Sequence, residues 1–201
     1  LYDPEIIVRS EQVSEDRTNG AGLNGGIPGA LSNQPPPPAP LTASAPPAPA
    51  PTPKGKLMNA SATRVDEIAD GIFRISTPVP ANVVPGGFTF NQYLIRDADP
   101  LLFHTGPRKL FAAVCEGIER VIPVATLRYV SFSHVEADEC GSLNQFLAAA
   151  PQAVPLCGQI AAMVSIADLA DRPPRALADQ ERLALGKHTV QWIDAPHLPH
   201  G

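Results

Sequence analysis

The sequence predicts an α/β domain that follows a segment without a packed core. Over residues 64–201, short apolar runs typical of strands alternate with runs of helical periodicity. Residues 1–57 contain twelve prolines and a single aromatic residue, Tyr2, so they hold too little apolar surface to offset the entropy of ordering. We therefore expect a disordered, Pro/Ala-rich segment over residues 1–57 and a folded domain over residues 58–201.

The expected strands of this domain end at turn-forming residues. Residues 65–75 read as two strands joined by a turn at Asp70 and Gly71. A strand over residues 90–96 stops at the Asp-Ala-Asp-Pro sequence that follows it, and one over residues 101–104 is closed by a Thr-Gly-Pro sequence. Three further apolar runs predict strands, at residues 127–132, 154–157 and 189–193.

Three segments between these strands predict helices. In residues 109–121, apolar side chains recur three or four positions apart, at Leu110, Val114, Ile118 and Val121. A second helix is expected over residues 141–150, where a proline follows, and a third over residues 159–170. Each helix lies between two expected strands, which is the order of an α/β fold.

The composition excludes two classes of partner. The net charge is −5, whereas proteins that bind nucleic acid usually present a basic face, so no nucleic-acid partner is expected. No run of 18 apolar residues occurs, so we expect no membrane span in this chain. The three cysteines form no C-x-x-C pair and are odd in number, which fits a reducing compartment. The sequence thus predicts a cytoplasmic domain.

The N-terminal segment has its own motifs. Residues 5–13 could form one extended strand, and the Pro/Ala-rich run over residues 35–53 predicts a stiff polyproline II spacer. On residues 2–4, 8–12 and 26–36, the first 53 residues resemble a periplasmic segment of the flagellar M-ring protein. This resemblance implies a structural ring component of the basal body, with ring-subunit association through the N-terminal segment and no catalysis. Met58 at the boundary could be an original start codon, which would make the chain a fusion of two unrelated pieces or a misjoined reading frame.

The residues that suggest chemistry follow the expected strand 127–132. His134, Glu136 and Asp138 alternate there, and in an extended backbone residues i, i+2 and i+4 can point the same way. One imidazole and two carboxylates suit iron, manganese or zinc. The alternative is a plain turn between strand and helix, with Asp138 or Glu139 stabilising the start of the helix. After the last strand, His197 and His200 offer a distant fourth ligand, or lie in a surface loop.

Together these features resemble the N-terminal half of a metallo-β-lactamase-fold domain, in the flavodiiron, oxygen-binding branch. The family carries H-x-[HE]-x-D-H after a core strand, and here the pattern reads His134-x-Glu136-x-Asp138-Glu139. Residues 101–106 are similar to its apolar-apolar-x-Asp-Thr-Gly element. The resemblance implies a partial αββα sandwich, truncated at its C-terminus, that holds two iron ions.

The resemblance also implies roles for the candidate ligands. His134 and Glu136 would bind the first metal and Asp138 the second, and His200 would complete the first, with His197 as the other choice. Glu139 stands where the family has His, so it either binds iron through oxygen or leaves that position empty.

A second departure is His104, which replaces an Asp that supports the family's site from beneath.

The implied activity is reduction of O₂ or NO with electrons from an external electron-donor protein. With zinc in place of iron, the same ligands would lower the pKa of a bound water and hydrolyse an ester or thioester. The alternative ranked before the hydrolase is a non-enzymatic structural segment of the flagellar M-ring.

Overall fold

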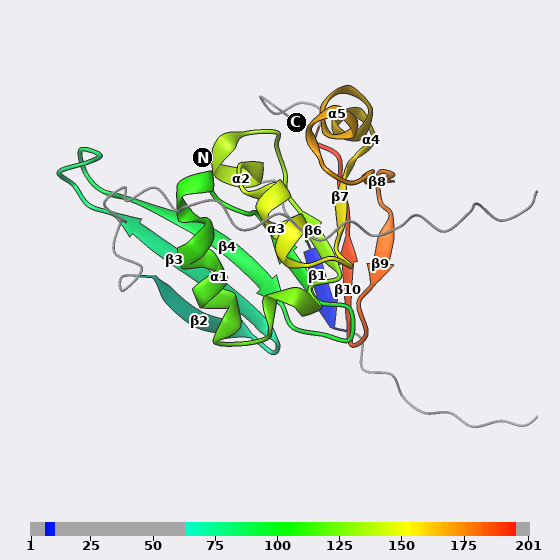
Figure 1. Ribbon diagram of the computed structural model, residues 1–201. Coiled ribbons are helices and arrows are strands. Elements are labelled where there is room, and N and C mark those ends of the chain that lie inside the picture. The colour runs from blue at the N-terminus through cyan, green and yellow to red at the C-terminus, as the bar shows by residue number, and fades with distance from the viewer. Residues whose placement is uncertain (1–6, 11–62, 196–201) are drawn as a thin grey trace, which may run out of the picture. The chain divides into compact units, whose positions relative to one another are not determined.

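The computed structural model describes residues 7–10 and 63–195 (Figure 1). The Pro/Ala-rich run, most of the M-ring-like residues, His197 and His200 lie outside these ranges. Among the described residues, no helix has the length and hydropathy that crossing a bilayer requires.

A seven-stranded sheet forms the centre of the domain. Its order is β2-β3-β4-β5-β6-β7-β8, antiparallel from β2 to β5 and parallel from β5 to β8. The bounds are β2 Arg64–Ala69, β3 Ile72–Val79, β4 Phe88–Ile95, β5 Leu101–Phe103, β6 Tyr129–Ser131, β7 Val154–Gly158 and β8 Arg175–Leu177. Because β5 and β6 are parallel neighbours, the loops at their carboxyl ends lie side by side, where sites of α/β sheets usually form.

A smaller antiparallel sheet has the order β1-β10-β9. It consists of β1 (Ile7–Ser10), β9 (Arg182–Ala184) and β10 (His188–Gln191). The backbone of β1 pairs with β10 over its whole length, from Ile7 opposite Gln191 to Ser10 opposite His188. Part of the expected N-terminal strand therefore belongs to the same compact unit as the α/β domain.

Helices pack on one face of the large sheet and the small sheet packs on the other. The helices are α1 (Phe111–Glu119), α2 (Ala137–Cys140), α3 (Leu143–Ala149), α4 (Gln159–Ala161) and α5 (Ala167–Leu169), with a π-helical turn over Ala162–Ile166 and single 3₁₀ turns at Arg108–Leu110 and Val124–Thr126. Figure 1 shows α1 and α3 lying over the sheet.

Two apolar cores separate the three layers. Leu102 of β5 packs with Val114 of α1 and Phe146 of α3 in the first core. Its neighbours Leu101 and Phe103 point the other way, into the second core between the sheets. A strand buried on both faces reads as a continuous apolar run, which is why residues 101–103 predict a strand without alternation.

The α/β class and the metallo-β-lactamase-like layers are thus confirmed. Helix, sheet and sheet are three of the four layers of an αββα sandwich. Strands β8 and β9 were not expected from the sequence, because three-residue strands with one buried residue each carry no periodic signal.

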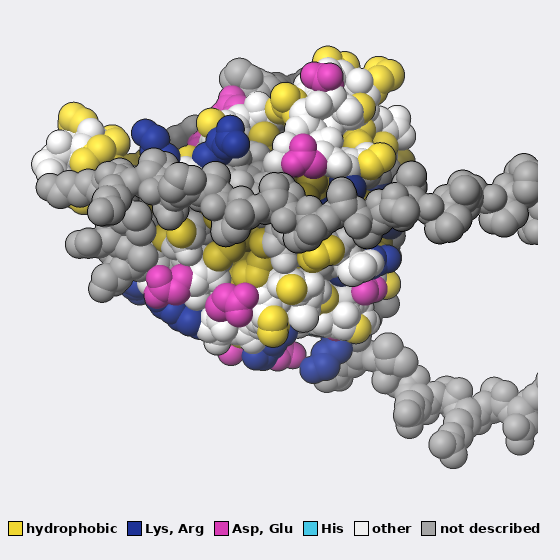
Figure 2. Space-filling model, in the orientation of Figure 1, with side chains coloured by type: hydrophobic (Ala, Val, Ile, Leu, Met, Phe, Trp, Pro, Cys, Tyr) yellow, Lys and Arg dark blue, Asp and Glu magenta, His cyan; other side chains and the backbone are white. Residues whose placement is uncertain are grey.

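Exposed apolar side chains gather over α4 and α5 and at the tip of the β3–β4 hairpin. Figure 2 shows both groups in yellow. The exposed fractions are largest for Met163 (77%), Ile160 (74%) and Val164 (68%) on the helical segment, and Val83 at the hairpin is 63% exposed. No described residue covers these side chains.

Candidate metal centre

The candidate site is built from the loops that follow β5 and β6. Directly after β5, His104 adopts a left-handed backbone conformation with φ of 64°, and Gly106 does so with φ of 74°. These two residues turn the chain sharply. His104 N–H donates to the Ser131 carbonyl at 2.8 Å, so the turn is fixed to the end of β6.

Hydrogen bonds from main-chain N–H groups and from the Thr105 hydroxyl then join this turn to the α2–α3 region. Thr105 donates to the Glu139 carbonyl from both its backbone N–H (2.6 Å) and its Oγ1 (3.1 Å). The backbone N–H of Ser142 donates to Thr105 Oγ1 and to the Gly106 carbonyl, each at 3.1 Å. Thr105 and Ser142 are fully buried, so these bonds satisfy polar groups that water does not reach.

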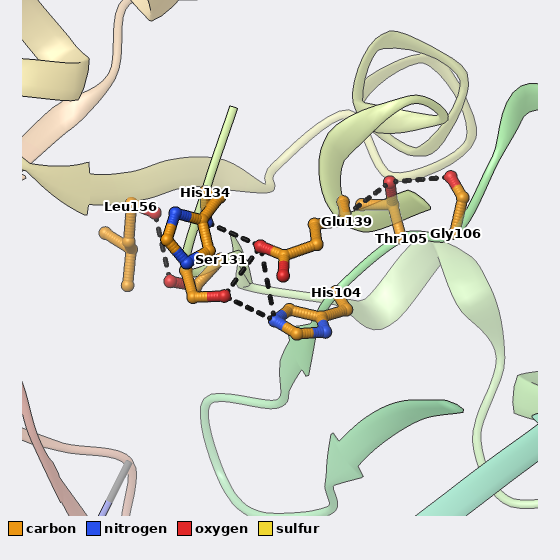
Figure 3. A network of polar contacts seen from close by, with 8 residues as sticks. His104, Thr105, Gly106, Ser131, His134, Glu139 and Leu156 are labelled. Carbon is orange, nitrogen blue, oxygen red and sulfur yellow. Dashed lines mark hydrogen bonds and ion pairs between the residues drawn. The ribbon is translucent and has the colours of Figure 1, made fainter. Parts of the chain in front are cut away.

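A network of side chains lies between the two loops (Figure 3). His104 Nε2 is 3.0 Å from Ser133 Oγ, and Ser133 Oγ donates to Glu139 Oε2 at 2.6 Å. The same Oε2 accepts the backbone N–H of His134 at 2.5 Å and lies 3.7 Å from His104 Nε2. The His104 and Glu139 side chains are only 8% and 12% exposed. Glu139 is therefore directed inward, beneath the loop that carries His134.

The other candidate ligands differ in exposure. His134, whose backbone N–H belongs to this network, is half-buried in the loop after β6, and Glu136 is exposed immediately before α2. Asp138 is exposed in the first turn of α2. The alternation expected for an extended chain stops at Ala137, because α2 begins there and changes the direction of the following side chains.

The donor types of the predicted set fit iron, which binds imidazole nitrogen and carboxylate oxygen. Among residues 7–10 and 63–195, however, no three His, Cys, Asp or Glu side chains form a group that could hold a metal ion. Two predicted ligands, His197 and His200, lie outside the described part of the chain. The ligand set therefore stays a prediction, with His134 and Glu136 on the loop after β6 and Asp138 in the first turn of α2.

Cys140, next to the carboxylates, does not provide a thiolate at neutral pH. Burial, together with the negative charges of Glu139 and Asp138, raises the pKa of its thiol to about 11. A free thiol with this pKa stays protonated and is a poor nucleophile. The local chemistry is thus that of nitrogen and oxygen donors.

Sequence reasoning alone does not assign a role to Ser133, which joins His104 to Glu139. Its only signal is its position, directly before the H-x-E-x-D pattern at the end of a buried strand.

Comparison with known proteins identifies the family. Residues 88–200 match the family model "ODP family beta lactamase", and the chain belongs to that family. The predicted flavodiiron branch of the metallo-β-lactamase fold is confirmed.

Individual relatives are flavoproteins and flavodiiron proteins. Diflavin flavoprotein A 2 of Nostoc sp. (strain PCC 7120) is 30% identical over 115 residues, which is 56% of this chain and 20% of the relative. The solved structure of rubredoxin oxygen:oxidoreductase from Desulfovibrio gigas superimposes with a TM-score of 0.59 at 24% identity, over 65% of this chain and 35% of that one. A flavodiiron core from Synechocystis sp. PCC6803 gives 0.54 at 23% identity, over 62% and 34%.

The chain thus spans a fifth of that curated relative's length and about a third of each of the two solved chains. None of these matches supports the flagellar M-ring resemblance of residues 1–53, or the zinc-hydrolase alternative.

Proposed function

We propose that this chain is a metal-binding domain with an iron centre of the flavodiiron type, which reduces O₂ or NO with electrons from an external donor protein. The observation that carries the proposal is the family match over residues 88–200, which includes the His134-x-Glu136-x-Asp138 pattern at the carboxyl end of β6. The name of one structural relative, rubredoxin oxygen:oxidoreductase, supports O₂ as substrate and a small redox protein as donor.

The proposed ligands are His134 and Glu136 for one iron and Asp138 for the other, with His200, or alternatively His197, completing the first. Iron with open coordination positions would supply the redox chemistry. The chain's own residues hold the His134 loop in place through Glu139 and Ser133. Three cysteines, all free, support a reducing, cytoplasmic location.

Metal stoichiometry tests the proposal. The full chain would be loaded with Fe²⁺ without oxygen, separated from free metal and analysed for iron. We expect about two iron ions per chain at saturation. The His134→Ala variant should lose at least half of the iron, whereas Glu116→Gln should keep it all, because Glu116 is half-exposed on α1 and paired with Arg120.

Oxygen uptake then tests the activity. The iron-loaded chain, supplied with a reduced rubredoxin, should consume O₂ or NO faster than the His134→Ala variant. Absence of stoichiometric iron would overturn the proposal. Tight binding of zinc with ester hydrolysis and no O₂ uptake would favour the hydrolase alternative.

A further inference from the structure

Glu139 has a role that the metal-ligand pattern does not assign to it. One of its oxygens, Oε2, faces three groups: Ser133 Oγ at 2.6 Å, the His134 N–H at 2.5 Å and His104 Nε2 at 3.7 Å. These groups come from two separate segments, the turn after β5 and the loop after β6. The main-chain carbonyl of Glu139 also accepts hydrogen bonds from the backbone N–H and the Oγ1 of Thr105.

The direction of each hydrogen bond follows from the donors available. An ionised carboxylate only accepts, so the single Ser133 hydroxyl proton points to Glu139 Oε2. Ser133 Oγ then accepts from His104, which fixes the proton of that ring on Nε2. The hydrogen bonds from Ser133 Oγ and from the His134 N–H to Oε2 are short, as hydrogen bonds to a carboxylate are.

We propose that Glu139 is a positioning residue, not a metal ligand, and that it holds the backbone of His134 against the turn that carries His104. This inference rests on the proposed function, because that function makes His134 a metal ligand. The hydrogen bonds of Glu139 themselves form without metal. Oε2 is already engaged by two donors, and the carboxylate is 12% exposed, whereas Glu136 and Asp138 are exposed. A move of Glu139 towards a metal would leave the His134 N–H and Ser133 hydroxyl without this acceptor.

The first test follows the amide proton of His134 by NMR in the metal-free full chain. A short bond to a carboxylate shifts an amide proton downfield and slows its exchange with solvent. In Glu139→Ala the His134 amide should move upfield and exchange at least about tenfold faster, as expected for one lost hydrogen bond. Glu139→Gln keeps an acceptor oxygen and should restore most of the protection. Glu116→Gln, on α1, should leave the amide unchanged.

The pairing of Glu139 with His104 is tested by placing an acidic residue at position 104 and a histidine at position 139. His104→Asp and Glu139→His should each lower the folding equilibrium constant, because each leaves a buried polar group without its partner. Asp is chosen at position 104 because Asp tolerates the left-handed backbone that His104 adopts. In the double variant, the folding equilibrium constant should be about tenfold or more higher than the two single effects together predict. Coupling of this size is what contacting residues show.

Addition of Zn²⁺, a diamagnetic probe, separates this inference from the proposed function. If Glu139 only positions the loop, the His134 amide keeps its downfield shift when the metal binds. Release of that amide on zinc binding, or no difference between wild type and Glu139→Ala without metal, would overturn the positioning role. If zinc and iron do not bind at all, the proposed function fails while the metal-free amide result still decides the role of Glu139.

Discussion

A buried carboxylate far from the candidate site provides the sharpest stability prediction. Asp97, in the turn after β4, accepts backbone N–H groups of Ala98, Lys187 and His188 at 2.7–3.0 Å. Its Oδ2 also lies 2.6 Å from His188 Nδ1, and the two side chains are 6% and 5% exposed. His188 Nε2 lies 2.8 Å from the Asp70 carbonyl. Both ring nitrogens of His188 therefore lie within hydrogen-bond distance of an oxygen atom.

The pKa of Asp97 reports how strongly the folded state holds the charged carboxylate. Burial raises this pKa, but the backbone N–H groups and the His188 side chain outweigh burial and lower it from 3.8 to about 2. At about 1.4 kcal/mol per unit, the charged form contributes about 2 kcal/mol to the free energy of unfolding. Because the folded pKa is depressed, this contribution is complete above about pH 4 and is lost as the pH falls towards 2.

The perturbation is Asp97→Asn, assayed by urea denaturation between pH 2 and pH 7 with the fluorescence of Trp192, the single tryptophan. At pH 7 the variant should be about 2 kcal/mol less stable than wild type, and this difference should disappear towards pH 2. Asp99→Asn is the matched control, because Asp99 lies in the same turn with its side chain 48% exposed, and should change stability by less than about 0.5 kcal/mol. Parallel pH profiles for wild type and Asp97→Asn would refute the reasoning.

Three further substitutions test the packing around the helices, each by urea denaturation at pH 7. Phe146→Ala should cost about 3–5 kcal/mol, because this ring is fully buried and packs edge-on against Phe111. Gly117→Ala should destabilise by about 1–3 kcal/mol despite the better helix propensity of Ala, because its Cβ would lie 2.8 Å from Ile75. Arg172→Ala should cost about 2 kcal/mol or more, since its guanidinium donates to three carbonyls at and after the end of α3.

Exposed residues provide the controls for these three variants. Leu169→Ala, at a side chain that is 55% exposed, and Lys109→Ala, at an exposed basic residue, should each change stability by less than about 0.5 kcal/mol. Equal losses in the core variants and in these controls would show that the helices do not pack on the sheet as described. An unchanged Gly117→Ala variant would show that α1 can move away from Ile75.

The sequence alone predicts the strands of the large sheet well where their side chains are buried on both faces. Residues 101–103 and 155–157 are buried on both faces of the sheet, so their continuous apolar runs indicate strands directly. The pairing of β1 with β10 could not be predicted, because it joins backbones about 180 residues apart in the sequence. Arg172 reads as part of a surface loop, although its long side chain reaches the main chain at the end of α3.

For the candidate site, the sequence predicts the place and the residue types. The H-x-E-x-D pattern begins in the loop after β6 and ends in the first turn of α2. The inward direction of Glu139 could not be predicted, because its partners His104 and Ser133 lie in two segments that only the parallel pairing of β5 and β6 brings together.

The strained turn at His104 explains why these two loops behave as one unit. A left-handed backbone costs a residue other than glycine about 1 kcal/mol or more, so it persists only where the surroundings hold it. Here the His104 N–H binds the Ser131 carbonyl, the ring stacks on Phe103 with 4.2 Å between centroids, and Nε2 binds Ser133. Two of these three contacts reach β6 or the loop after it. The conformation of the turn after β5 therefore depends on the loop that carries His134, and any change in one shifts the geometry of the other.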